Sequence, residues 1–461
     1  DALRRHMGAS EPCQEKERMN RAILTGLAVA VGSSMGGEPI RVRITGAWEV
    51  TVGPGALRLE DGRTVTVNED AVTVPVHAPI LVEKERHPRL RVFAEKAAGW
   101  RRGERLKALV TQECSAAGAL IPETVKAQAE DGTELSLNAD FRVEGGWGTV
   151  GRVDGGKIGP NDPVSLSYRY YPNRLHAIAI SGDGSVRLVE GTPGVGIQQL
   201  PELTAGETLI ATIWLSGRVT AVAEDNLFVL DGTPPPASEW FGKAEERLPS
   251  TMAKLRNGEP LTIVAWGDSV TNGGGVGGDR TRWYQHVFVA GLRQRFPTSD
   301  IALRTAAWPG GNSRGYMAAP PGGKYDFKRD VLDPKPGLVT IEFVNDAGLH
   351  GEALEKHYGK IMAILRENGS EVILITPHFV RPDWMRVTSL KFDDDPRPYV
   401  KGLRQFAREN DVAVADAALL WGHLWREGIP YMTLEGNSIN HPDTRGHRMF
   451  ADALLGVFPE K

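Results

Sequence analysis

Residues 263–275 read IVAWGDSVTNGGG, an apolar run that stops at Gly267-Asp268-Ser269 and is followed at once by a cluster of glycines. A short, continuous apolar run bounded by turn residues is typical of a strand that is buried on both faces. The turn after it has two interpretations. Ser269 is a nucleophile placed just beyond a strand, or the glycines cradle a phosphate as a dinucleotide-binding loop does.

Further apolar runs follow in the C-terminal half, and stretches with helical periodicity lie between them. The runs are residues 301–308 (IALRTAAW), 337–344 (GLVTIEFV), 371–376 (EVILIT) and 411–417 (DVAVADA). Strand and helix that alternate over about 220 residues predict a doubly wound, mostly parallel α/β domain. In such a sheet ligands bind beyond the carboxyl ends of the strands, so the residues just after each run are the candidates for a site.

The first half of the chain has a different pattern. Residues 39–231 are β-rich, because short runs alternate apolar and polar residues and are separated by turn signals such as Gly53-Pro54-Gly55. This pattern predicts an all-β, sandwich-like accessory domain or a pair of small β-modules. Residues 95–113 are the one stretch there for which we predict a helix. Consecutive prolines mark a linker at residues 232–248, which leaves 249–461 for the α/β domain.

The composition is that of a globular protein with more than one core. The chain has 461 residues, of which 41% are hydrophobic and 24% charged, with a formal net charge of −4. Such a balance argues against a nucleic-acid partner, and no apolar run is long enough for a membrane span. We therefore expect a small-molecule or polysaccharide partner. Cys13 and Cys114 lack the spacing of zinc ligands, although a single bridge between them remains open.

The N-terminal extension, residues 1–38, has a signal-like part. Residues 19–37 contain an apolar stretch that follows Lys16, Arg18 and Arg21 and precedes small residues, which is the layout of a secretory signal. This layout predicts a secreted or periplasmic protein. The alternative is a strand followed by a glycine turn, in a cytoplasmic protein.

The phosphate-binding interpretation of the glycines is the weaker one. Gly273, Gly275 and Gly278 satisfy GxGxxG, but six residues separate them from the apolar run, whereas the fingerprint lies on the first tight turn. No GK[ST] follows, which excludes a P-loop. We therefore favour a flexible loop for the glycines and a catalytic role for the serine.

Other strand ends carry the chemistry that a serine nucleophile needs. Gly311 offers a backbone N–H after the second run, Asn345 offers a side-chain amide after the third, and His441 lies at the start of a predicted last helix. A hydroxyl becomes a nucleophile when a base takes its proton, and acyl transfer needs donors for the developing oxyanion. These residues supply a base and donors at the edge of the sheet where Ser269 is expected.

Four sequence blocks in this half resemble those of the SGNH (GDSL-type) hydrolases, in the same order. The blocks are GDSV at 267–270, GGNS at 310–313, VND at 344–346 and HPDTRGH at 441–447. The resemblance covers residues 249–458 and implies a flavodoxin-like three-layer α/β/α fold with ester hydrolysis through an acyl-enzyme. By position it implies Ser269 as nucleophile, His441 as general base, and an oxyanion hole made by the Ser269 and Gly311 N–H groups and the Asn345 side chain. No metal or organic cofactor is implied.

One departure from the family pattern concerns the histidine. The family usually places an aspartate three residues before it, and Ser438 stands at that position here. An orienting carboxylate fixes the tautomer of the imidazole and stabilises the imidazolium. The candidates for this role are Ser438 and Asn437, in a Ser-His dyad oriented by a carbonyl or amide, or Glu435, the nearest upstream carboxylate. A weakened or lost activity is the third alternative.

The sequence thus predicts a serine esterase that removes acetyl or another short acyl group, most simply from a carbohydrate. Trp308 and Trp384 fall at or beyond strand ends, where an aromatic face can stack on a sugar ring, and Arg314 can meet an acidic group on a substrate. Two alternatives stay open. An acyltransferase would use the same residues, and a non-catalytic glycan-binding or structural protein would explain the missing aspartate.

Overall fold

The C-terminal half is built on a five-stranded parallel sheet with the strand order β18-β17-β19-β20-β21. The computed structural model describes residues 39–59 and 62–460, so the predicted signal-like segment and Cys13 lie outside the described residues. The strands are β17 (Pro260–Gly267), β18 (Asp300–Ala307), β19 (Leu338–Glu342), β20 (Glu371–Ile375) and β21 (Ala413–Ala415). The order reverses beside β17, which is the flavodoxin-like topology that the family resemblance implies.

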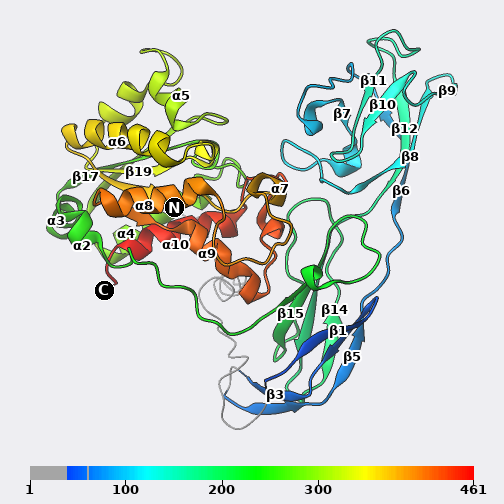
Figure 1. Ribbon diagram of the computed structural model, residues 1–461, viewed down its shortest axis with the longest axis horizontal. Coiled ribbons are helices and arrows are strands. Elements are labelled where there is room, and N and C mark those ends of the chain that lie inside the picture. Colours follow the sequence, from blue (N-terminus) through cyan, green and yellow to red (C-terminus); the bar gives the residue numbers. More distant parts are fainter. Residues whose placement is uncertain (1–38, 60–61, 461) are drawn as a thin grey trace, which may run out of the picture.

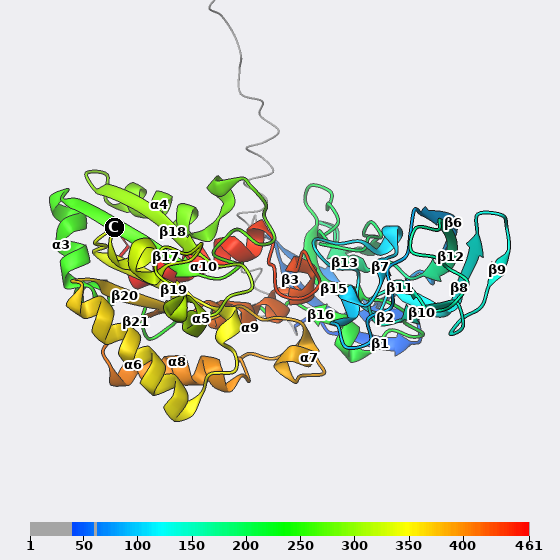
Figure 2. The same ribbon diagram turned by 90° about the horizontal axis from the view of Figure 1, so that it is seen from above.

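Both faces of this sheet are buried, as the continuous apolar runs predict. Along β17, Leu261 and Ile263 point into one core, and Val264 and Trp266 point into the other. Figure 2 shows the sheet between two helical layers. The first core contains α4 (Tyr284–Arg295) and α10 (Thr444–Val457), and the second contains α6 (Gly351–Glu367) and α8 (Pro398–Glu409).

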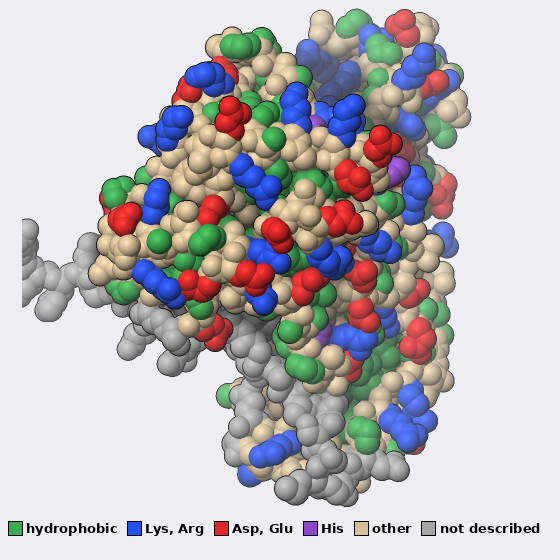
Figure 3. Space-filling view, turned by 60° about the vertical axis from the view of Figure 1, so that its left-hand side comes forward, with side chains coloured by type: hydrophobic (Ala, Val, Ile, Leu, Met, Phe, Trp, Pro, Cys, Tyr) green, Lys and Arg blue, Asp and Glu red, His purple; other side chains and the backbone are tan. Residues whose placement is uncertain are grey.

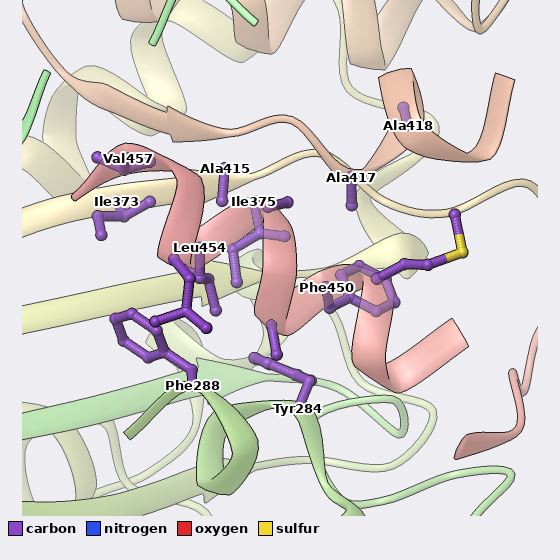
Figure 4. Packing of buried hydrophobic residues seen from close by; sticks show 14 of the residues in the cluster. Tyr284, Phe288, Ile373, Ile375, Ala415, Ala417, Ala418, Phe450, Leu454 and Val457 are labelled. Atoms are coloured by element: carbon purple, nitrogen blue, oxygen red, sulfur yellow. The ribbon is translucent and has the colours of Figure 1, made fainter. Parts of the chain in front are cut away.

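Helix α10 matters for the site because it begins just after His441. Phe450, Leu454 and Val457 of this helix pack between the sheet and α4, against Ile375 and Phe288 among others (Figure 4). These side chains are at most 1% exposed. Burial of each such side chain stabilises the fold by about 1.5–3 kcal/mol. The loop that carries His441 is therefore joined to a helix that the core holds in place.

The N-terminal half contains two β-modules with separate cores, and one is inserted in the other. The base module consists of β1 (Val42–Gly46), β2 (Glu49–Val52), β3 (Gly55–Arg58), β4 (Thr64–Val67), β5 (Asp70–Thr73), β13 (Arg174–Ile180), β14 (Val186–Val189), β15 (Thr208–Leu215) and β16 (Leu227–Val229). The inserted module lies between β5 and β13. It consists of β6 (Ile80–His87), β7 (Glu104–Arg105), β8 (Leu120–Ala129), β9 (Glu134–Leu135), β10 (Phe141–Glu144), β11 (Thr149–Arg152) and β12 (Val164–Tyr170).

The helix predicted at residues 95–113 does not form. The segment folds instead as two 3₁₀ turns, η1 (Gly99–Arg101) and η2 (Lys107–Leu109), around strand β7. Two glycines explain the difference. A Cβ at Gly99 would lie 2.2 Å from the Trp147 ring, and one at Gly103 would lie 2.4 Å from the Val150 backbone, so the segment follows the inserted module too closely for a helix.

The two halves of the chain pack against each other. Leu175, Trp214 and Phe228 of the base module form a cluster with Leu390 and Trp425 of the C-terminal half. In this interface the Thr212 hydroxyl donates a hydrogen bond of 2.6 Å to the Gly428 carbonyl. Figure 1 shows loops of the inserted module beside helix α7 (Pro382–Met385). The segment predicted as a linker is also anchored, because Trp240 is buried in the second core of the sheet.

The surface carries charges of both signs. On the face in Figure 3, acidic and basic side chains are interspersed with uncharged ones. Within residues 39–59 and 62–460, no helix combines the length and the apolar character needed to cross a membrane.

Candidate active site

Four segments meet at the carboxyl edge of the parallel sheet. Ser269 follows β17, Gly311 follows β18, and Asn345 lies in the 3₁₀ turn after β19. His441 precedes α10 and reaches the same edge from the C-terminal end of the chain. We predicted from the sequence that these four residues meet at this edge. Doubly wound folds bind their ligands at the topological switch point, which here lies beside β17.

Ser269 and His441 are in hydrogen-bond contact. The Ser269 Oγ lies 2.9 Å from His441 Nε2. Both residues are nearly buried, with 9% and 6% of their surface exposed. A serine hydroxyl that donates to a neutral imidazole has its proton acceptor in place, which is the geometry required for attack on a carbonyl.

The glycine cluster after Ser269 packs closely around this pair. A Cβ at Gly274 would lie 2.8 Å from the Ser269 carbonyl oxygen and 3.0 Å from His441 Cδ2, and one at Gly275 would lie 1.8 Å from the Pro442 oxygen. Hydrogen bonds hold the loop as well, since Gly274 N–H donates to the Ser269 carbonyl and His447 Nε2 lies 2.9 Å from the Gly274 carbonyl. The glycines are there for close approach, so the flexible loop expected from the sequence is instead a packed wall of the site.

His447 supports this wall and takes no part in the Ser269 contact. Its Nδ1 accepts a hydrogen bond of 3.2 Å from the Tyr284 N–H, while Nε2 faces Gly274. Burial lowers the pKa of His447 to about 4, so the ring is neutral and can donate from one nitrogen and accept at the other.

The three residues that the sequence offered for orienting His441 do not contact its Nδ1. Asn437 instead organises the loop, because its Oδ1 accepts the backbone N–H groups of Ile439, Asn440 and His441 at 2.9–3.0 Å. Ser438 lies in the left-handed region, with φ 58°. Among the described residues, no hydrogen-bond acceptor is aligned with Nδ1.

Glu435 is also placed away from the ring. Its carboxyl is 1% exposed and lies 3.7 Å from His378 Nε2, and neither oxygen has a hydrogen-bond partner among the described residues. Burial, with the nearby charge of Asp443, raises the pKa of Glu435 well above its usual value. A neutral acid at this position cannot stabilise an imidazolium at His441.

A carboxylate that the sequence did not identify lies beside His441. The Glu113 Oε2 is 3.1 Å from His441 Nδ1, an ion-pair distance without the alignment of a hydrogen bond. Glu113 belongs to the inserted module and lies between η2 and β8. No motif marks this residue, because the contact depends on how two separate folding units pack.

The donors around Ser269 differ in one respect from the expected oxyanion hole. The Ser269 N–H has no hydrogen-bond partner among the described residues, and Asn345 uses one of its two Nδ2 protons, donated to the Gly311 carbonyl at 3.0 Å. The Gly311 N–H, however, donates to the Trp308 carbonyl at 2.8 Å. Pro309 and Gly310, with φ 74° at Gly310, form a turn between them that takes up this proton. Two donors, Ser269 and Asn345, remain free.

Buried carboxyls fix the positions of these donors. Asp268 is fully buried and accepts the backbone N–H groups of Asn345 and Val270 at 3.0 and 3.1 Å. Burial raises the pKa of Asp268 to about 7. Asp346 accepts from the N–H and the hydroxyl of Ser313, which ties the loop after β18 to the turn that carries Asn345. Both acids thus hold the loops at the sheet edge in place through the hydrogen bonds that they accept.

The three candidate substrate-binding residues differ in exposure. Trp308 is half-buried and stacks on Tyr325, with ring centroids 4.4 Å apart. Arg314 is exposed on α5 (Ser313–Ala318). Trp384 on α7 is 49% exposed, and its ring lies 6.2 Å from that of Trp100 in the inserted module. The contacts that these side chains make with other described residues do not indicate which ligand they would bind.

No cluster of three or more His, Cys, Asp or Glu side chains suited to a metal ion occurs in the part of the chain that the structure describes. The polar groups around Ser269 are two amide N–H donors, which suit an oxyanion, and an imidazole nitrogen, which can accept a proton.

Part of the chain matches a known protein family, and several solved structures are similar to it. Residues 265–449 match the GDSL-like lipase/acylhydrolase family. No curated protein matches the chain. Among solved structures, a two-domain esterase active on acetylated mannans, co-crystallised with mannopentaose, is 20% identical with a TM-score of 0.37, over 47% of this chain and 54% of its own. An acetylxylan esterase from Geobacillus stearothermophilus is 20% identical with a TM-score of 0.35, over 43% of this chain and 95% of its own. The chain thus spans about half the length of the two-domain esterase.

Proposed function

Because the C-terminal domain belongs to the GDSL-like lipase/acylhydrolase family, we propose that the protein hydrolyses carboxylic esters with Ser269 as nucleophile and His441 as general base. The observation that carries the proposal is the 2.9 Å contact between Ser269 Oγ and His441 Nε2, beside two free N–H donors. A nucleophile, its base and oxyanion donors are the minimum set for acyl transfer.

The reaction has two steps. In the first, His441 Nε2 accepts the Ser269 proton while Oγ attacks the ester carbonyl, and the negative charge that develops on the carbonyl oxygen faces the Ser269 N–H and the Asn345 amide. His441 then gives the proton to the departing alcohol, and an acyl-serine remains. In the second step His441 takes a proton from the water that attacks the acyl-serine. It then gives this proton to Ser269 Oγ as the acid is released, which restores the free enzyme.

We propose that the acyl group is short. Within residues 249–460, Trp384 is the only large hydrophobic side chain exposed at the surface, so this domain offers little apolar surface to a long chain. The protein should hydrolyse p-nitrophenyl acetate with a higher kcat/KM than p-nitrophenyl octanoate. A preference for the octanoate would contradict a short acyl group and leave the nucleophile unaffected.

We propose a carbohydrate as the alcohol part of the substrate. Two features support this: Trp384 is half-exposed, and Trp308, which follows β18 and stacks on Tyr325, lies in the loop that leads to Gly311. Aromatic faces suit the apolar face of a sugar ring. Release of acetate from acetylated oligosaccharides tests this part. An enzyme that cleaves p-nitrophenyl acetate but none of a panel of acetylated glycans would contradict it.

The nucleophile is tested by substitution. Ser269→Ala should lower kcat on p-nitrophenyl acetate by about 10³-fold or more, because the acyl-serine can no longer form. Ser370→Ala is the matched control, since this buried serine donates to the Pro336 carbonyl and precedes β20 at the opposite end of the sheet. Turnover by Ser269→Ala equal to that of the control would exclude Ser269 as the nucleophile.

A further inference from the structure

A hairpin of the inserted module reaches into the C-terminal domain beside His441. Val110 and Ser115 pair across this hairpin, and Glu113 lies at its tip with φ 61°. The Cys114 N–H donates to the Gln112 carbonyl at 2.7 Å, so Glu113 is the central residue of a γ-turn with positive φ. This turn is rare and unfavourable for a residue that has a side chain, and such conformations persist where the surroundings hold them.

The surroundings of the 110–115 hairpin do hold it, through two hydrogen bonds from Gln112. The Gln112 Nε2 donates to the Gly275 carbonyl at 3.0 Å, and its backbone N–H donates to the Gly436 carbonyl at 3.3 Å. Gly275 lies in the loop after Ser269 and Gly436 in the loop before His441. The residue next to Glu113 therefore bonds to both segments that carry the proposed nucleophile and base.

Apolar contacts support the same docking. Cys114 is 2% exposed and packs with Trp147 of the inserted module and Ile439 of the C-terminal domain. The Arg381 guanidinium lies over the Trp147 ring, 4.4 Å from its centroid. The hairpin tip is thus fixed from both sides of Glu113, and the carboxylate is carried to His441 by the packing of two domains.

We propose that Glu113 is the positioning carboxylate of His441, so that the inserted module completes the active site of the C-terminal domain. This inference rests on the proposed function. Its geometric basis is the 3.1 Å distance between Glu113 Oε2 and His441 Nδ1, on the opposite side of the ring from Ser269. Catalytic hydrogen bonds are often poorly aligned before substrate binds and tighten as charge develops on the base, which is when the imidazolium gains most from a carboxylate.

The charges around Glu113 favour its ionised form. The contact with His441, opposed by partial burial and aided by Arg101 and Arg105, lowers the pKa of the Glu113 carboxyl. The side chain remains 67% exposed and keeps contact with water. The Glu113 carboxyl is therefore ionised at neutral pH.

The other titratable groups that face His441 do not share this property. They are Asp268 after β17, His378 after β20 and His447 on α10. Burial raises the pKa of Asp268 to about 7 and lowers the pKa of both histidines. At mildly acidic pH these three buried groups are therefore largely uncharged. Glu113, at 3.1 Å, is the carboxylate that the described part of the chain brings to Nδ1.

The test compares Glu113→Gln with Glu134→Gln in the full-length protein. Glu134 is an exposed glutamate of the same module, on β9 and away from the site. We expect Glu113→Gln to lower kcat on p-nitrophenyl acetate by about 10²-fold with little change in KM, because a positioning carboxylate acts when the imidazolium forms. Glu134→Gln should match the wild type.

Two further readouts separate a positioning role from a structural one. A carboxylate beside an imidazole favours the imidazolium, so its removal should move the acid limb of the kcat/KM profile to lower pH. In Glu113→Ala, added formate should restore part of the activity, because the exposed position admits a small carboxylate. A fall in kcat that comes without the pH shift, or wild-type kcat in Glu113→Gln, would overturn the inference.

The same assay separates this inference from the proposed function. If Ser269→Ala is inactive and Glu113→Gln behaves as the wild type, the esterase proposal stands and the role of Glu113 falls. If Ser269→Ala retains wild-type turnover, the proposed function itself fails.

Discussion

Two clusters of a serine, a histidine and an acid involve the C-terminal domain, one of them with an acid from the inserted module, and they differ in the order of contact. In one, Ser269 contacts His441, and the far side of the ring faces Glu113. In the other, Ser313 lies in the middle: its hydroxyl contacts both Asp346 Oδ2 and His357 Nε2, the latter at 2.7 Å.

This order decides what each serine can do. The Ser313 hydroxyl donates its proton to Asp346, a carboxylate that also accepts from the Ser313 N–H and the Tyr358 hydroxyl. It therefore has no proton to give to His357, and it is fully buried. Among the described residues, the Ser269 hydroxyl has only the imidazole as its acceptor. Residue types alone do not make a nucleophile; the order of contacts and access to the substrate do.

The two histidines give the largest expected difference. His441→Ala should lower kcat on p-nitrophenyl acetate by about 10³-fold or more, because it removes the nitrogen that accepts the Ser269 proton. His357→Ala should stay within about threefold of the wild type and lower the free energy of unfolding by about 1–2 kcal/mol, through the lost hydrogen bond to Ser313. Steady-state kinetics and denaturant unfolding measure both. Equal losses of kcat in the two variants would erase the distinction between the clusters.

The next difference concerns the two free oxyanion donors of the Ser269 cluster, which are the Ser269 N–H and the Asn345 side-chain amide. Asn345→Ala should reduce kcat by about 10²-fold, since it removes one of the two free oxyanion donors. The control is Asn312→Ala, because Asn312 caps α5 by accepting the Gly315 N–H at 2.8 Å and should cost about 1 kcal/mol of stability with little effect on kcat. A kcat that is insensitive to Asn345 would remove the amide from the oxyanion hole.

A smaller effect is expected from the wall beside His441. Gly274→Ala would place a Cβ 3.0 Å from the His441 ring and 2.8 Å from the Ser269 carbonyl oxygen, so the ring must shift and kcat should fall about tenfold. Gly278→Ala serves as the control, because a Cβ there meets nothing within 4 Å. The kinetic comparison of these two variants checks whether the glycines matter through contact with the histidine. Identical kinetics would contradict the close packing.

The smallest effect on activity is expected at Glu435, which lies close to His441 in sequence but does not contact its Nδ1. Glu435→Gln should keep kcat within about twofold, in contrast to Glu113→Gln. Its effect should appear in stability. The pKa of Glu435 is raised in the folded protein, so folding above the unfolded pKa of about 4.3 requires uptake of a proton and stability falls as pH rises.

The amide cannot ionise, so in Glu435→Gln this fall should disappear. Denaturant unfolding between pH 4 and pH 8 measures it, and the wild type should lose more stability over this range than the variant. A large loss of kcat in Glu435→Gln would instead restore this residue as a candidate for orienting His441.

Much of the fold, and the meeting of three site residues at one edge of the sheet, could be predicted from the sequence. The continuous apolar runs predict strands buried on both faces, and β17 and its neighbours meet that expectation with alternate residues in two cores. Ser269, Asn345 and His441 could be placed on one edge because parallel strands bring their carboxyl ends together. These inferences depend on the local sequence pattern and on the order of the strands, and both can be recognised in the sequence.

What the sequence did not predict depends on details of packing. The turn at Pro309-Gly310 uses the Gly311 N–H, which a motif match cannot detect. Glu113 reaches His441 only because an inserted β-module docks on another domain, and its segment was expected to be helical. Gly99 and Gly103 carried a signal against that helix, but their close contacts become visible only in three dimensions.

The most direct test of the central claim is covalent labelling of the activated serine. The full-length protein is treated with a fluorophosphonate, and the modified peptide is identified by mass spectrometry. The account predicts one label per chain, on Ser269, with none on Ser313 and none at all in Ser269→Ala. A label on another serine, or no label on a protein that still hydrolyses p-nitrophenyl acetate, would contradict it.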